Sequence, residues 1–205
     1  MAGRDGERGA RRRLEEVARE AVAAGVDLIQ VRERDLATVD LVDLVQAIVA
    51  LARGSSTRVV VNDRFDVALA CGASGVHLRA DSIVPAVARS IAPPEFLIGR
   101  SVHRLDEAVT YAPSVDYLIA GTVFSTLSKP SADRLLSVVG LAEIVQAVSV
   151  PVLAIGGVTI ARVSEICATG AAGLAGIGLF VDSTMSMTDL MEAVRARFDS
   201  MKAAS

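Results

Sequence analysis

Two glycine-bearing segments carry the residues best suited to bind a phosphate. Gly156 and Gly157 end an apolar run and precede a helical pattern that opens at Thr159, while Gly176 and Gly178 interrupt the next apolar run. Glycine leaves the backbone N–H groups uncovered by side chains. Such groups form an anion-binding site where a strand end leads into a helix. The pattern therefore predicts phosphate binding. The alternative is that the glycines only allow a helix to pack tightly on a strand.

The segment IQVRERD places long polar side chains at every second position. Gln30, Arg32 and Arg34 alternate with other residues, and alternation in a strand points all three to the same face. Two guanidinium groups on one face can clamp a carboxylate or a phosphate. The alternative is a rim of ion pairs with Glu33 and Asp35.

Asn62 and Asp63 end the very apolar run VVVN and begin a polar turn. Their side chains suit a ligand or a metal ion. Capping of the helical pattern that starts at Arg64 is the alternative, because Asn and Asp are good helix caps.

The chain has two histidines, and their contexts differ. His77 lies inside the apolar segment GVHL, which favours a buried structural role. His103 follows a predicted strand by a few residues, so an imidazole that titrates near neutral pH would be placed at the strand ends as a general acid or base. The alternative for His103 is helix capping or a surface position.

A hydroxyl-rich loop spans residues 122–131 and contains one lysine, Lys129. Thr126, Ser128 and Lys129 are candidates for hydrogen bonds to a small polar ligand. We expect residues 125–138 to form a flap over the site.

Short apolar runs alternate with amphipathic helical patterns along the whole chain. The predicted strands span residues 26–31, 58–62, 75–78, 96–99, 116–120, 151–155 and 173–177. The predicted helices span residues 10–24, 36–53, 64–71, 83–91, 104–111, 140–148, 159–169 and 186–200. Continuous Val, Ile and Leu runs are typical of parallel strands covered on both faces, joined by right-handed crossovers.

The pattern favours an α/β fold of the TIM-type (β/α)8 barrel, which here lacks its first strand, over an open doubly wound sheet. Polar residues follow nearly every strand, and in a barrel these positions meet at one rim. They are Gln30, Arg32, Asn62, Asp63, His77, Arg79, Arg100, Ser101, Thr122, Gly156 and Gly157, of which Ser101 is a further substrate-binding candidate. Residues 1–9 contain no apolar run for a first strand.

Composition predicts one soluble cytoplasmic domain over residues 1–205, with residues 1–9 disordered. The chain is 52% hydrophobic but only 3% aromatic, and its net charge is −3. These values argue against partners such as nucleic acid or a membrane surface. The basic cluster at residues 11–13 is expected to be a solvated helix face. Cys71 and Cys167 lie in apolar helical patterns and are expected to be buried free thiols.

Five segments together resemble the thiamine phosphate synthase/TenI superfamily. They are GVDLIQVRERD, NDRFDVALACGASGVHL, IGRSVH, VFSTLSKP and VPVLAIGGVT, and the resemblance runs in order from about residue 10 to residue 182. It implies a (β/α)8 barrel and an enzyme of thiamine biosynthesis. Two activities occur in the superfamily. A synthase joins an aminopyrimidine diphosphate to a thiazole phosphate with Mg²⁺, and a tautomerase moves a proton on a carboxythiazole phosphate without a metal.

The resemblance implies roles for particular residues. The thiazole phosphate site maps onto Gly156, Gly157, Ile177 and Gly178. The pyrimidine-diphosphate side maps onto Gln30, Arg32, Arg34, Asn62 and Asp63, and the hydroxyl loop onto Thr126, Ser128 and Lys129. Under the synthase reading, Asp63 and Asp81 share Mg²⁺.

Departures from the synthase pattern set the order of the hypotheses. Arg34 stands where synthases have Lys, and HLRADS places Arg79 and Ala80 where they have Gly-Gln and Ser82 where they have a metal-binding Asp. Losing a carboxylate should weaken Mg²⁺ binding.

The first hypothesis is therefore a TenI-like thiazole tautomerase, an isomerase without cofactor, with His103 as proton shuttle. A Mg²⁺-dependent synthase, a transferase, is the alternative, and a non-catalytic barrel that binds a phosphorylated ligand is the third. The expected partner is a small phosphorylated thiazole, and the resemblance leaves a homodimer open.

Overall fold

The computed structural model describes residues 2–125 and 135–203, and the chain forms two compact units, Met1–His77 and Leu78–Ser205. The assignment of residues 1–205 to one domain stays a prediction.

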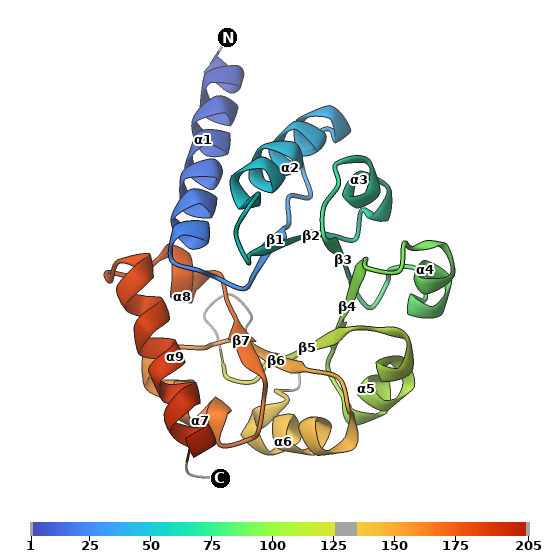
Figure 1. Ribbon diagram of the computed structural model, residues 1–205, viewed down its shortest axis with the longest axis vertical. Helices are drawn as coiled ribbons and strands as arrows, with labels where there is room; N and C mark the ends of the chain where they lie inside the picture. Colours follow the sequence, from blue (N-terminus) through green and yellow to red (C-terminus); the bar gives the residue numbers. More distant parts are fainter. Residues whose placement is uncertain (1, 126–134, 204–205) are drawn as a thin grey trace. The chain divides into compact units, whose positions relative to one another are not determined.

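The first unit is built from three parallel strands and three helices. Its elements are α1 (Ala2–Ala23), β1 (Leu28–Val31), α2 (Thr38–Ala52), β2 (Arg58–Asn62), α3 (Phe65–Ala70) and β3 (Gly75–Leu78), of which only the last residue, Leu78, is counted in the second unit. β2 pairs with β1 and β3, and in register Ile29 opposes Val59 while Val61 opposes Val76. α1 lies alongside α2 (Figure 1). The apolar run of β2 is buried and α2 packs on this strand, as expected for a strand covered on both faces; Leu44 and Val45 of α2 are buried as well.

The second unit continues the same alternation of strands and helices. Its elements are α4 (Pro85–Ile91), β4 (Leu97–Val102), α5 (Leu105–Tyr111), η1 (Ala112–Ser114), β5 (Tyr117–Gly121), α6 (Ser137–Ala147), β6 (Val152–Ile155), η2 (Ile160–Arg162), α7 (Val163–Cys167), β7 (Gly173–Ala175), α8 (Gly178–Val181) and α9 (Met187–Ala203). β4, β5, β6 and β7 pair in this order, all parallel. Their carboxyl ends therefore lie at one edge, and the loops that follow them are neighbours.

Burial of apolar side chains stabilises the strands and the helices of the second unit. Ile98, Leu118, Leu141 and Ile144 are fully buried. α9 packs on α7 through Val163, Cys167, Leu190 and Val194 (Figure 1). Each such aliphatic side chain contributes about 1.5–3 kcal/mol relative to an exposed one.

All seven predicted strands are present in the described residues, with ends that differ by up to three positions. The predicted helix 159–169 is divided into η2 and α7, and the short α8 has no counterpart in the prediction. α1 begins at Ala2, inside the segment 1–9 that the sequence predicts to be disordered. In the described ranges the first strand, β1, follows α1.

The described helices include none that combines the length and the apolar character needed to cross a membrane. Both cysteines are free thiols. Cys167 is buried as predicted, whereas Cys71 is only partly buried, and burial raises the pKa of both.

Tyr117 gives a prediction for alkaline pH. Its ring fills the space where a Cβ on Gly99 would lie, and only 7% of the residue is exposed. Burial, with a smaller effect from the charge of Asp116, raises the pKa of its hydroxyl. The folded state therefore keeps the proton at pH values where the unfolded chain releases it, so stability falls as pH rises above about 10. In the unmodified chain we expect the free energy of unfolding to fall with a slope that approaches about 1.4 kcal/mol per pH unit, and we expect Tyr117→Phe to remove this slope.

Denaturant unfolding of the unmodified chain and of Tyr117→Phe, at several values from pH 9 to pH 11, measures this slope. Two curves that stay parallel over that range would show that Tyr117 does not contribute to it.

Candidate functional site

Two polar side chains predicted for the site are joined in the first unit. Gln30 of β1 donates from Nε2 to Oδ1 of Asn62 at the end of β2, at 3.0 Å. Asn62 is 9% exposed and Gln30 is partly buried. Within the described residues this bond leaves Oε1 of Gln30 as an acceptor and Nδ2 of Asn62 as a donor. Such a pair matches a ring that presents an amino group beside a ring nitrogen.

The alternation predicted for Gln30, Arg32 and Arg34 is wrong for the two arginines. β1 ends at Val31, so both lie beyond the strand, where the two-residue period no longer fixes their direction. Both are exposed. They remain candidates for an anionic ligand, but their position does not follow from strand geometry.

Asp63 has an unusual backbone conformation at the end of β2. Its φ is 64°, in the left-handed region that residues other than glycine seldom adopt, and its N–H donates to the His77 carbonyl at 2.9 Å. The N-cap position of α3 belongs to Arg64, without a side-chain capping bond, so capping of α3 does not account for Asp63. A strained residue at a strand end is consistent with a functional position. His77 is 2% exposed and is a core residue, as predicted.

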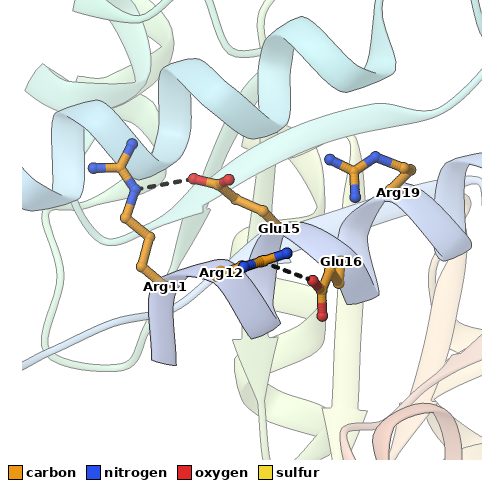
Figure 2. A pocket seen from close by; sticks show the side chains of 5 residues that line it. All are labelled: Arg11, Arg12, Glu15, Glu16 and Arg19. Carbon is orange, nitrogen blue, oxygen red and sulfur yellow. Dashed lines mark hydrogen bonds and ion pairs between the residues drawn. The ribbon is translucent and has the colours of Figure 1, made fainter. Parts of the chain in front are cut away.

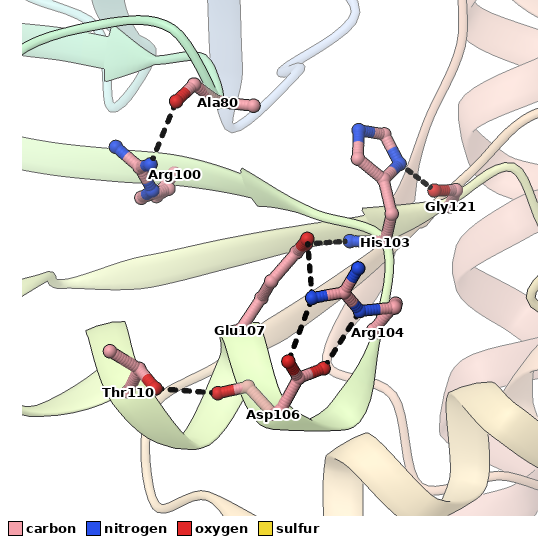
Figure 3. A network of polar contacts seen from close by, with 8 residues as sticks. All are labelled: Ala80, Arg100, His103, Arg104, Asp106, Glu107, Thr110 and Gly121. Atoms are coloured by element: carbon pink, nitrogen blue, oxygen red, sulfur yellow. Dashed lines mark hydrogen bonds and ion pairs between the residues drawn. The ribbon is translucent and has the colours of Figure 1, made fainter.

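His103 lies directly after β4 and is held at two atoms (Figure 3). Its Nδ1 is hydrogen-bonded to the carbonyl of Gly121 at the end of β5, and its backbone N–H donates to Glu107 Oε2 at 2.7 Å. Because a carbonyl only accepts, Nδ1 carries the proton and Nε2 of the neutral ring is the basic atom. The residue is exposed.

Arg104 organises the start of α5 beside His103. It pairs with Asp106 at 2.8 Å and with Glu107 at 3.6 Å. The hydrogen bond from Arg104 lowers the pKa of Asp106. This exposed cluster (Figure 3) fixes the backbone on which His103 sits.

The glycine pair after β6 contacts the loop after β5. A Cβ on Gly156, whose φ is 99°, would lie 2.4 Å from Thr122 Cγ2. A Cβ on Gly157, whose φ is 61°, would lie 2.7 Å from the Phe124 carbonyl oxygen and 2.6 Å from that of Ser125. Close packing therefore requires glycine at both positions, but the packing is against the loop after β5 and not, as the alternative had it, of a helix on a strand. Thr159 stands at the N-cap position of η2, where the helical pattern was expected to open, but its side chain makes no capping hydrogen bond.

The glycines after β7 have no such requirement. A Cβ on Gly176 would lie 3.5 Å from Leu179 Cβ, and one on Gly178 would lie 3.4 Å from Asp182 Oδ2, both ordinary contacts. Neither has a positive φ. Ile177, between them, is 69% exposed. Among the described residues, neither packing nor backbone conformation demands glycine at these two positions.

Asp81 forms an ion pair with the neighbouring Arg79. Its Oδ2 accepts from Arg79 Nη2 at 2.5 Å, and the Ser82 hydroxyl accepts the Arg79 backbone N–H at 2.7 Å. The described residues contain no group of three His, Cys, Asp or Glu side chains able to hold a metal. As the side chains stand, they do not fit a Mg²⁺ site at Asp81.

The remaining predicted residues are placed as follows. Ser101 lies in β4 and is partly buried. Thr126, Ser128 and Lys129, and most of the predicted flap at 125–138, lie outside the described residues.

A hollow of about 550 Å³ lies along α1, lined by Arg11, Arg12, Glu15, Glu16 and Arg19 (Figure 2). Arg11 pairs with Glu15 at 2.9 Å and Arg12 with Glu16 at 3.2 Å. These i, i+4 pairs on an exposed helix match the solvated face that the sequence predicts.

Sequence reasoning gave one arginine, Arg100, no specific role and missed another, Arg162. Arg100 in β4 is 3% exposed, stacks 3.9 Å from the Tyr111 ring centroid and donates to the Ala80 carbonyl at 3.3 Å. Arg162 in η2 lies beside the glycine pair. Arg100 was read only as a rim residue, and the position of Arg162 in a helical pattern gave no signal that it contacts a loop.

Comparison with known proteins identifies relatives over almost the whole chain. The family model described as thiamine monophosphate synthase matches residues 4–180. A thiamine-phosphate synthase of Methanoregula boonei is 41% identical over 194 residues, 93% of this chain and 90% of that protein. One of Methanoculleus marisnigri is 40% identical over 185 residues, 88% of each chain.

A solved structure has the same fold. The thiamine phosphate pyrophosphorylase from Pyrococcus furiosus aligns with a TM-score of 0.81 and 34% identity, over 91% of this chain and 90% of that one. This likeness confirms the predicted fold class, a TIM-type α/β barrel that lacks a strand in the described part of this chain.

Proposed function

The chain belongs to the thiamine monophosphate synthase family, and we propose that it is a thiamine-phosphate synthase, which joins an aminopyrimidine diphosphate to a thiazole phosphate and releases pyrophosphate. The observation that carries this proposal is the shared name of relatives that match nearly the full chain. Thiamine biosynthesis, and an enzyme rather than a non-catalytic barrel, follow from the same relatives. The cytoplasmic location stays a prediction.

This proposal reverses the order of the two enzymatic hypotheses. The tautomerase was placed first because Ser82 stands where synthases have a metal-binding Asp. The relatives are named as synthases, so the isomerase reading has no support from them. Ser82 is accounted for locally, because its hydroxyl holds the backbone of Arg79.

The amide pair of the first unit suits the aminopyrimidine. Gln30 and Asn62 hold each other in place, so one acceptor and one donor are fixed before a ligand arrives. In our proposal they orient the ring, while Arg32 and Arg34 offset the negative charge that grows on the leaving diphosphate. Preorganised donors and cations lower a barrier when they face developing charge.

The loops of the second unit suit the thiazole phosphate. The amides of Ile177 and Gly178 are in an open segment, and Gly156 and Gly157 are held rigidly by the neighbouring loop. In our proposal these four residues bind the phosphate through backbone N–H groups, so recognition needs no titratable side chain.

We assign no step to Mg²⁺ from these residues, because Asp81 is paired with Arg79. Whether the reaction needs the ion is decided by titration. The test of the function is pyrophosphate release by the full chain, with each substrate alone and with both, at increasing Mg²⁺. Release that needs both substrates supports the proposal, and no release at any Mg²⁺ concentration overturns it.

His103 separates the two enzymatic hypotheses. A synthase does not depend on a proton shuttle at Nε2, so we expect His103→Ala to lower pyrophosphate release by less than about tenfold, whereas loss of a general acid or base costs about 10²–10⁴-fold. His103→Gln, which keeps a donor for the Gly121 carbonyl, is the matched control for loss of the hydrogen bond. A loss beyond about 10²-fold in both variants would assign His103 to the chemistry.

A further inference from the structure

Arg162 joins the loops that follow two neighbouring strands. It ends η2, five residues after Gly157, and its Nη1 donates to the Gly157 carbonyl at 3.2 Å. The residue is partly buried. This bond is local, because η2 begins only three residues beyond Gly157, and it holds the turn that directly follows β6.

The same guanidinium covers a residue of the other loop. Its Cζ lies 4.5 Å from the centroid of the Phe124 ring, and Phe124 follows β5. A guanidinium over an aromatic face is attracted by the ring quadrupole. One side chain therefore contacts the loop after β5 through the ring and the loop after β6 through a carbonyl.

The two loops are also in direct backbone contact. The N–H of Val123 donates to the Ile155 carbonyl at 2.9 Å, and that of Phe124 donates to the Gly156 carbonyl at 3.1 Å. The Gly157 backbone approaches so closely that a Cβ would be 2.7 Å from the Phe124 carbonyl oxygen. Gly156 and Gly157 have no side chains that could stabilise this contact with the loop after β5. The side chain of Arg162 provides that stabilisation in their place.

We propose that Arg162 is a positioning residue that clamps the loop after β5 onto the glycine pair and so keeps the backbone of Gly156 and Gly157 in the conformation that binds a phosphate monoester. The phosphate part of this inference rests on the proposed function, whereas the clamp itself does not. The guanidinium of Arg162 is a cation beside this loop, which also favours an anion there. Its contribution should therefore appear in phosphate affinity and not in turnover.

Arg162→Met tests the clamp, because Met keeps the length of the side chain but has no charge or donor. Arg162→Lys keeps the charge and loses the planar fork, and Phe124→Leu removes only the ring. Arg197→Met is the matched control, since Arg197 Nη1 donates to the Ala193 carbonyl at 2.6 Å within α9.

The first measurement is calorimetric binding of a thiazole phosphate and of the corresponding thiazole alcohol. We expect Arg162→Met to weaken phosphate binding by about tenfold, with alcohol binding and turnover at saturation within about twofold, and Arg162→Lys to recover part of the loss. Equal weakening of phosphate and alcohol, or no weakening, would overturn the phosphate role.

The second measurement is amide hydrogen exchange of Phe124 without ligand. We expect about tenfold faster exchange in Arg162→Met, a smaller increase in Phe124→Leu, and no change in Arg197→Met. Unchanged exchange in Arg162→Met would overturn the clamp. If the unmodified protein does not bind thiazole phosphate, the proposed function and the phosphate role both fail, while exchange still decides the clamp.

Discussion

Gly157→Ala is expected to destabilise the fold by roughly 3 kcal/mol or more, because two costs add at this position. Its φ of 61° is strained for alanine, and the new Cβ would lie within 2.7 Å of the carbonyl oxygens of Phe124 and Ser125. Both oxygens belong to backbone, so the loop after β5 must move to make room. We also expect phosphate binding to be lost in the fraction that folds.

Gly170→Ala is the matched control for this prediction. Gly170 lies in the same unit with a φ of 79°, and a Cβ there would meet only Val145 Cγ1 at 3.4 Å. Its cost should be that of the left-handed conformation alone, about 1–2 kcal/mol. Urea unfolding of both variants measures the difference. Equal losses would show that the contact between the two loops does not constrain Gly157.

Asn62→Ala is expected to lower kcat/KM for the aminopyrimidine diphosphate by about 10²-fold. The substitution removes the donor proposed for the ring and leaves the partly buried amide of Gln30 without the acceptor that lies 3.0 Å away. Gln30→Ala should cause a similar loss, and the double variant should be little worse than either single one, because the two amides act as a unit.

Steady-state kinetics of pyrophosphate release measures these effects. Gln46→Ala, which changes an exposed amide on α2, should leave kcat/KM unchanged. If Asn62→Ala retains kcat/KM within about threefold, or if the two single losses add fully, the amide pair does not orient the substrate.

Most of the fold was predictable because burial leaves a clear mark on the sequence. The three consecutive valines at 59–61 are almost fully buried, and a run of this kind between turn residues identifies a strand covered on both faces. Element ends were harder to predict. β1 ends at Val31, although polar residues keep the two-residue alternation through Arg34. The sequence pattern therefore extends three residues beyond the end of the strand.

The site was predicted less well, for reasons that lie in contacts distant along the chain. The positions of Gln30 and Asn62 in the predicted strands correctly placed them near the ends of neighbouring strands. This closeness allows the hydrogen bond between them. It could not show that Gly157 packs on Phe124 and Ser125, more than 30 residues earlier, or that Arg162 lies over the Phe124 ring. The substitution at Ser82 placed the tautomerase first, but the Ser82 hydroxyl holds a turn, so the substitution does not by itself argue against a synthase.

In our proposal the chain joins two substrates and does not isomerise one. The most direct measurement is a ³¹P NMR time course of the full chain with Mg²⁺, aminopyrimidine diphosphate, thiazole phosphate and carboxythiazole phosphate in one sample. We predict that the diphosphate signals decline as inorganic pyrophosphate and one new phosphate monoester appear in equal amounts. Unchanged diphosphate signals, with isomerisation of the carboxythiazole phosphate, would show that the chain is an isomerase and not a synthase.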